Sequence, residues 1–135
     1  MLVPLIAVVC LPLSVSGKQP RSASFEPYFA GTDAFRDFRA KRWAAASRGF
    51  AQWAKANPRS PHKNRALLLQ YTAALYAGES TKAAVGLETL LGAFPLLDDY
   101  VRLLAADARH REGLSGRALR HLDAIGGDPF AQRQK

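Results

Sequence analysis

Apolar side chains in most of this chain recur at steps of three and four residues rather than two. That spacing places them on one face of an α-helix, whereas a half-buried strand would alternate apolar and polar residues. Breakers fall between the apolar stretches at regular intervals, as expected where short turns separate helices. The pattern holds from Thr32 onward and predicts an all-α fold. The first apolar set with this spacing is Trp43, Ala46, Phe50 and Trp53.

Prolines and glycines predict where the helices end. Asn57-Pro58 should end the first long helix, because proline disfavours the helical conformation of the residue before it. A second helix is expected from about Pro61 to Ala77, with Ser60 as its cap and Gly78 as its stop. Capping of later helices is expected from two further serines, Ser80 and Ser115.

One arrangement of residues occurs three times along the chain. Each set has a small Ala, large apolar residues four and seven positions later, and then a proline. The sets start 37 and 35 residues apart, and a glycine precedes the second and third Ala by five positions. The members are Ala46, Phe50, Trp53 and Pro58; then Gly78, Ala83, Leu87, Leu90 and Pro95; then Gly113, Ala118, Leu122, Ile125 and Pro129.

A repeat of this length is typical of tetratricopeptide-like helical hairpins, whose period is about 34 residues. The small Ala would let the second helix of a hairpin approach the first, and the large residues would fill the groove between hairpins. Hairpins are therefore expected over about 32–57, 61–94 and 95–126, stacked as a short α-solenoid within a repeat domain spanning 32–135.

The aromatic residues of the first hairpin are interpreted as core rather than as a ligand-binding box. Trp43, Phe50 and Trp53 share one helical face. Trp43→Ala should therefore cost about 3–5 kcal/mol, as large-to-small core changes do.

The first 17 residues differ from the rest, since they contain no Asp, Glu, Lys or Arg. An apolar run over 2–15 is followed by small residues and then by Lys18, which resembles a secretory signal peptide. The run is shorter than a transmembrane helix needs. We expect export and loss of 1–17, the alternatives being a buried strand or a frayed terminus. Lipidation of Cys10, the one cysteine, is disfavoured by the bulky residues before it.

Positive charge is concentrated near the N-terminus. The chain has a net charge of +8, and the residues from Lys18 to Arg65 include eleven bases and three acids, while the remainder is balanced. A basic lead-in over 18–31 would precede a patch that suits an anionic partner: wall polymer, lipid headgroups or an acidic protein. The alternative is a solvated basic face. Export would disfavour nucleic acid. The patch would consist of Arg36, Arg39, Lys41, Arg42, Arg48 and Lys55.

No motif predicts catalysis, a metal or a cofactor. One cysteine excludes an internal disulfide framework and a cysteine-rich zinc site, and no His-Glu-x-x-His motif occurs. No glycine-rich phosphate loop or Gly-x-Ser-x-Gly elbow is found. His110 and His121 should fall on the two helices of the third hairpin, where contact between helices or exposure is the expected fate, and His62 is the third histidine.

The third hairpin carries a family resemblance. It begins with Pro95-Leu96-Leu97-Asp98-Asp99-Tyr100, turns at Gly113 and leaves through Asp128-Pro129-Phe130. This pattern resembles the N-terminal α-superhelical region of soluble lytic murein transglycosylases. The resemblance covers most of residues 25–135 and implies a periplasmic helical-repeat region that accompanies a lysozyme-like catalytic domain acting on peptidoglycan. It also implies that Tyr100 is one of the structural residues of the repeat.

The catalytic features of that family are not recognised here. Its acid is a Glu in a Glu-Ser pair with a downstream Gly-Leu-Met-Gln segment, but Glu79-Ser80 lies at a turn and no such segment follows. We therefore expect a non-catalytic scaffold for peptidoglycan turnover, as a fragment or truncated relative whose parent would be the enzyme. The alternative is a free-standing tetratricopeptide adaptor that binds a peptide or protein partner.

Overall fold

The computed structural model describes residues 28–126 of the 135-residue chain, and that range contains six helices and no strand. The all-α prediction is confirmed for this range. The expected signal peptide over 1–17, most of the lead-in over 18–31 and the Asp128-Pro129-Phe130 exit lie outside it. The helices are α1 (Asp33–Arg39), α2 (Trp43–Ala56), α3 (Lys63–Tyr76), α4 (Ser80–Thr89), α5 (Asp98–Arg111) and α6 (Ser115–Asp123).

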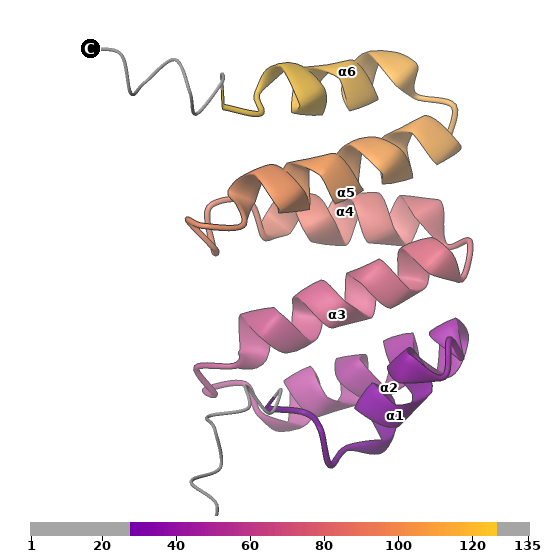
Figure 1. Ribbon diagram of the computed structural model, residues 1–135, viewed down its shortest axis with the longest axis vertical. Helices are drawn as coiled ribbons and strands as arrows, with labels where there is room; N and C mark the ends of the chain where they lie inside the picture. The colour runs from indigo at the N-terminus through magenta and orange to yellow at the C-terminus, as the bar shows by residue number, and fades with distance from the viewer. Residues whose placement is uncertain (1–27, 127–135) are drawn as a thin grey trace, which may run out of the picture.

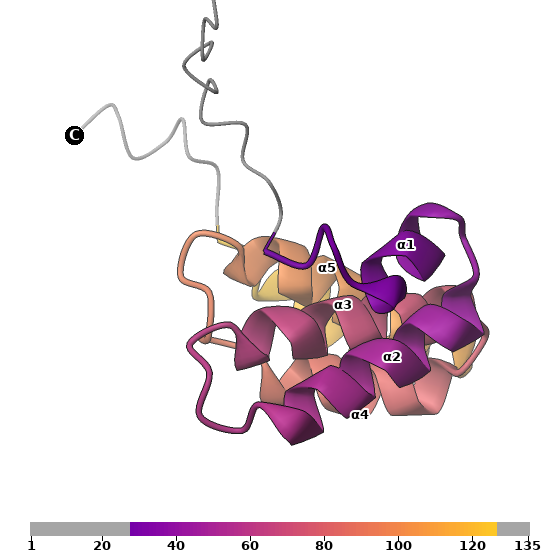
Figure 2. The same cartoon turned by 90° about the horizontal axis from the view of Figure 1, so that it is seen from below.

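Each helix packs mainly on the helices before and after it in the sequence. Figure 1 shows the resulting stack, which runs from α1 and α2 at one end to α6 at the other. Viewed along the stack, α1, α3 and α5 lie on one side and α2 and α4 on the other (Figure 2). The helices fall two by two within residues 32–57, 61–94 and 95–126.

The turns within these helix pairs depend on left-handed backbone. Gly78 and Gly113 have φ angles of 88° and 80°, which glycine adopts without steric cost. Lys41 has the same conformation, with φ 59°, between α1 and α2. After α2, the side-chain amide of Asn57 donates to the carbonyl of Trp53 at 2.8 Å, which closes the helix before Pro58. Proline and glycine therefore end these helices as the sequence indicates.

The expected serine caps are wrong. Ser80 and Ser115 are the first residues of α4 and α6, and the residues before them occupy the cap positions without a capping side chain. The cause lies in the glycine turns: the N–H of Glu79 bonds the carbonyl of Ala74, and Leu114 repeats this on Arg109, both at 2.9 Å. These Schellman-type bonds satisfy carbonyls at the ends of α3 and α5, and they place Glu79 and Leu114, not the serines, at the cap positions of the next helices.

Ser60 lies two residues before His62, which occupies the cap position of α3, so Ser60 does not cap this helix. Its hydroxyl accepts the N–H of His62 at 3.1 Å, but α3 begins only at Lys63. The side chain that caps a helix is instead Thr32, whose hydroxyl accepts the N–H of Phe35 at 3.2 Å and so fixes the start of α1.

The buried side chains form two clusters. One joins α3, α4 and α5 around Leu75, Leu87 and Val101, all fully buried. The other joins α1, α2 and α3 around Phe50 and Phe29, the latter from the segment before α1. Both clusters bury small alanines where helices approach closely, which keeps the helices within packing distance.

Six of the residues expected to build the repeat are buried, whereas the two tryptophans, Tyr100 and Leu122 are not. Trp43 and Trp53 are half-buried, while Tyr100 is 49% exposed and Leu122 is 42% exposed. Trp43 begins α2 and touches Phe38 and Tyr76 at the edge of the fold, with ring centroids 5.3 and 4.9 Å away. Leu122 lies on α6, and no helix of the described range covers its outer face. The buried members are Ala46, Phe50, Ala83, Leu87, Leu90 and Ala118.

None of the helices within residues 28–126 combines the length and the apolar composition that crossing a membrane requires.

Candidate functional site

The basic patch expected from the sequence lies on α1, α2 and the turn between them. All six side chains are exposed. Between residues 28 and 65 the chain has nine Lys and Arg residues and only two acids. This surface is called the basic face below. Its members are Arg36, Arg39, Lys41, Arg42, Arg48 and Lys55.

Two members of the basic face are paired with the acids. Arg36 contacts Asp33 at 2.7 Å, and the guanidinium of Arg42 contacts one oxygen of Asp37 at 2.6 and 2.8 Å. In both pairs the arginine side chain is exposed to solvent, so the pairs contribute little to stability. The other four cations have no carboxylate within 4.0 Å among the described residues. The basic face therefore keeps a net positive charge.

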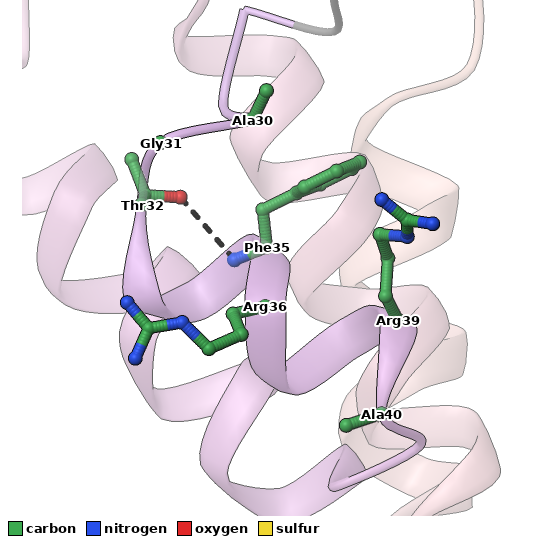
Figure 3. A pocket seen from close by; sticks show the side chains of 7 residues that line it. All are labelled: Ala30, Gly31, Thr32, Phe35, Arg36, Arg39 and Ala40. Carbon is green, nitrogen blue, oxygen red and sulfur yellow. Dashed lines mark hydrogen bonds between the residues drawn. The ribbon is translucent and has the colours of Figure 1, made fainter.

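A hollow of about 470 Å³ adjoins the basic face at the start of α1. Its floor includes Thr32 and Phe35, and the hydroxyl of Thr32 is already engaged with the N–H of Phe35 (Figure 3). Arg36 and Arg39 also line it, but Figure 3 shows their guanidinium groups on opposite sides of the Phe35 ring. The two cations do not converge on one point. The arrangement suits a ligand with spaced charges better than one small anion.

A second concave surface is apolar. It has a volume of about 820 Å³ and lies between α3, the residues before α1 and the loop between α4 and α5. Leu96, on its rim, is 98% exposed, and Leu97 is 47% exposed. It is called the apolar groove below. Its lining consists of Tyr28, Phe29, His62, Arg65, Leu68, Leu69, Ala93, Phe94, Pro95, Leu96 and Leu97.

Sequence reasoning did not assign these groove residues to a site. Two signals were present. Leu67-Leu68-Leu69 puts three large apolar residues in succession, more than one helical face can bury, and residues 93–97 are apolar in a stretch expected to be a turn. Only the fold brings α3 and this loop to the same groove.

A polar network ties the last three helices together. Arg109 of α5 contacts both carboxylate oxygens of Glu88 in α4, at 2.6 and 2.8 Å, and one of Glu112 at 2.9 Å. His121 of α6 contacts Glu88 at 2.9 Å. The Arg109 side chain is 7% exposed. A guanidinium this buried needs such partners, because an unpaired charge in the interior costs several kcal/mol.

The contacts in this network shift the ionisation of its members. Hydrogen bonds from Arg109, with a further one from His121, hold the pKa of Glu88 at about 2 against an ordinary 4.5, although partial burial opposes the shift. Hydrogen bonds to Glu88 first and then to Glu112 raise the pKa of Arg109 above its ordinary value, although burial opposes the shift. Glu88 and Arg109 therefore stay charged at neutral pH, and the geometry of the network is that of an inter-helix connection rather than of an open reaction site.

The remaining polar residues considered from the sequence do not form a site. His121 meets Glu88, whereas His110 is exposed, so the two histidines of the third helix pair are not brought together. Glu79 forms an exposed pair with Lys82 at 2.9 Å and lines neither of the two concave surfaces described above. Within residues 28–126, no group of three or more His, Cys, Asp or Glu side chains is placed to hold a metal ion.

Comparison of the chain with protein-family models, with curated proteins and with solved structures gives no match.

Proposed function

We propose that this chain is a non-catalytic helical-repeat scaffold that holds an anionic cell-wall polymer against its basic face, as the resemblance to the superhelical region of lytic murein transglycosylases implies. The proposal includes a tetratricopeptide-like solenoid arrangement. Three helix pairs in sequence order and a buried Ala in the second helix of each pair support it.

The observation that carries the proposal is the segregation of charge. Nine bases and two acids occupy residues 28–65, while residues 66–126 have six bases and seven acids. The exposed cations extend over two helices and a turn and do not converge on one pocket. A polyanion can contact such spaced cations together, and the attraction is long-ranged enough to steer it to this end of the molecule.

Export is part of the same proposal, since peptidoglycan lies outside the cytoplasm. It rests on the apolar, uncharged run over 2–15 and on the small residues that follow it. Cleavage of peptidoglycan would belong to a separate lysozyme-like domain, so the chain by itself would bind wall material without degrading it.

Sedimentation with purified peptidoglycan tests the proposal. Wild-type protein should pellet with the polymer, and about 0.5 M NaCl should release it, because exposed charges are screened within a few ångströms at high salt. The triple variant Arg39→Gln, Arg48→Gln and Lys55→Gln should pellet several-fold less. A matched triple variant outside the basic face, Lys82→Gln, Arg117→Gln and Arg120→Gln, removes the same charge and should pellet like the wild type.

Two results would contradict the proposal. Equal loss of pelleting in both triple variants would mean that net charge, not the basic face, governs attachment. Release of soluble muropeptides by the purified chain would show that it is an enzyme.

One observation favours a second function. The apolar groove is exposed and concave, and such an apolar surface offers a polyanion no favourable contact. A free-standing adaptor that binds a protein partner would use this groove. The adaptor would pull down a protein and would not pellet with peptidoglycan.

A further inference from the structure

We infer that the apolar groove binds an extended segment of another protein in which two or more large apolar side chains stand beside a carboxylate. The inference rests on the protein-binding alternative above and is independent of wall attachment through the basic face. Four properties of the groove support it: the exposed apolar side chains on its rim, the contacts that fix its walls, its charge and its shape.

The rim of the groove exposes three large apolar side chains to water. Leu96 is 98% exposed, Tyr28 is 57% exposed and Leu97 is 47% exposed, and all three border the same concavity. Scattered single apolar residues are normal on a protein surface, but a contiguous apolar patch with a polar border is typical of an interaction site. Binding would remove these side chains from water.

The walls of the groove are held in place without a ligand. Phe29 is 3% exposed and packs edge-on against Trp53 and Phe50, with centroids 5.0 and 5.4 Å away. Tyr28 stacks on His62 with centroids 3.8 Å apart. A preformed groove lowers the conformational entropy that binding costs.

The opposite wall is held by Asp98, which follows the 93–97 loop. Its carboxylate accepts the N–H of Gly92 at 2.7 Å and contacts Arg102 at 2.9 Å, so the two ends of the loop are joined. The N–H of Leu97 also bonds the carbonyl of Phe94 at 2.8 Å. These bonds fix the backbone that presents Leu96, which therefore projects from a defined turn.

The charge of the groove selects the partner. Within residues 28–126, its one charged lining residue is Arg65, and the imidazole of His62 lies beside it, with 3.5 Å between Arg65 Nη1 and His62 Nδ1. No acid is found among the described residues that line it. An apolar segment with a carboxylate would meet a complementary cation, whereas a Lys or Arg at that place would be repelled.

The shape favours a polypeptide chain. The groove runs from the residues before α1, across α3, to the 93–97 loop, and its volume of about 820 Å³ exceeds that of a single side chain. An extended chain turns alternate side chains to one face, so two apolar residues at spacing two could both enter the groove. The carboxylate that reaches Arg65 would belong to the bound segment itself, at a residue next to these apolar positions.

Selection from a displayed library of random dodecapeptides, followed by titration of a fluorescent synthetic copy of the enriched sequence, tests the inference. The enriched peptides should combine two large apolar residues with an Asp or Glu. Affinity should fall about tenfold or more in Leu96→Ser and in Arg65→Glu, since one lost apolar or ionic contact of about 1.4 kcal/mol changes Kd tenfold. Leu96 is 98% exposed, so its replacement leaves the fold intact, which thermal unfolding would verify.

Matched controls lie on α6, away from the groove. Leu119, which is 57% exposed, and Arg120 undergo the same chemical changes in Leu119→Ser and Arg120→Glu, and both variants should bind the peptide as the wild type does. Peptidoglycan pelleting of Leu96→Ser should also equal that of the wild type, so failure of this inference and failure of wall attachment can be told apart.

Four outcomes would overturn the inference: no enrichment over Leu96→Ser used as bait, enrichment of apolar peptides with Lys or Arg, unchanged affinity in Arg65→Glu, or unchanged affinity in Leu96→Ser. Pelleting with phosphatidylglycerol vesicles that is lost in Leu96→Ser would also overturn it, because the same side chain would then be a membrane contact.

Discussion

The ring of Tyr71 in α3 lies directly against Gly86 in α4. A Cβ atom built on Gly86 would come within 2.3 Å of the ring carbons, closer than any real contact. Glycine inside a helix costs about 1 kcal/mol relative to alanine, so its presence here needs a compensating gain. The close contact between Tyr71 and α4 provides it.

We expect Gly86→Ala to destabilise the protein by about 1–3 kcal/mol, because the added methyl group forces the Tyr71 ring to move in a packed interior. Gly116 in α6 is the matched control, since a Cβ there meets nothing within 4 Å. Gly116→Ala should raise stability by up to about 1 kcal/mol through helix propensity alone. Urea unfolding of both variants measures the difference. A gain in stability for Gly86→Ala would show that the contact is loose.

The aromatic residues of α2 should differ in their contribution to stability. Phe50 is fully buried, so Phe50→Ala should cost about 3–5 kcal/mol. Trp43 is half-buried and keeps one side in water, so Trp43→Ala should cost less than Phe50→Ala. This replaces the expectation that Trp43 is a full core residue. Thermal unfolding of the two variants gives the order, and an equal or larger loss for Trp43→Ala would contradict the placement of its ring.

Glu88 should stabilise the contact of α4 with α5 and α6. We expect Glu88→Gln to cost about 1.5–3 kcal/mol, as hydrogen bonds to charged groups do, because Arg109 and His121 both lose a charged acceptor. The control is Glu79→Gln, which removes an exposed pair with Lys82 and should cost no more than about 1 kcal/mol. Urea unfolding at pH 7 compares them. Similar small effects in both variants would mean that the network adds no stability.

The stabilising effect of Glu88 should depend on pH in a defined direction. Its pKa is lowered to about 2 in the folded protein from an ordinary 4.5, so its contribution is present above about pH 4.5 and is lost as pH falls toward 2. Asp98 and Glu112 also have lowered pKa values, held by the Gly92 N–H and by the Thr81 side chain respectively. The useful quantity is therefore the stability difference between wild type and Glu88→Gln.

That difference should shrink as pH falls from about 4.5 toward 2, as urea unfolding at several pH values in this range would reveal. The contribution of Asp98 cancels in the comparison, because both proteins contain it and its partners, Gly92 and Arg102, lie outside the Glu88 network. A difference that does not change between pH 5 and pH 2.5 would contradict the lowered pKa of Glu88.

Local sequence signals located the helices well because their causes are local. The step of three and four residues marks a helical face whatever lies beside it, and proline after Asn57 or glycine at 78 and 113 limits the backbone directly. The serine caps failed for an equally local reason: the glycine turn is one residue shorter than the prediction required, so Glu79 and Leu114 occupy the cap positions and the two serines become the first helical residues.

The position of a residue in the stack could not be predicted in the same way. Leu87 and Leu122 occupy equivalent positions in the repeated sets, yet Leu87 is fully buried and Leu122 is 42% exposed. Leu87 lies in a cluster shared by α3, α4 and α5, whereas α6 has one main packing neighbour among the described helices. Burial depends on the neighbouring helix, which a repeat pattern does not specify.

The sequence by itself determined the all-α architecture, the order of the helices within residues 28–126 and the concentration of positive charge toward the N-terminus, because periodicity, breakers and charge are properties of neighbouring residues. Only the tertiary structure decided that Arg109 meets Glu88, 21 positions away, and that α3 and the 93–97 loop share a groove. Such contacts depend on how the helices stack, since partners far apart in the chain meet only after packing has fixed their distance.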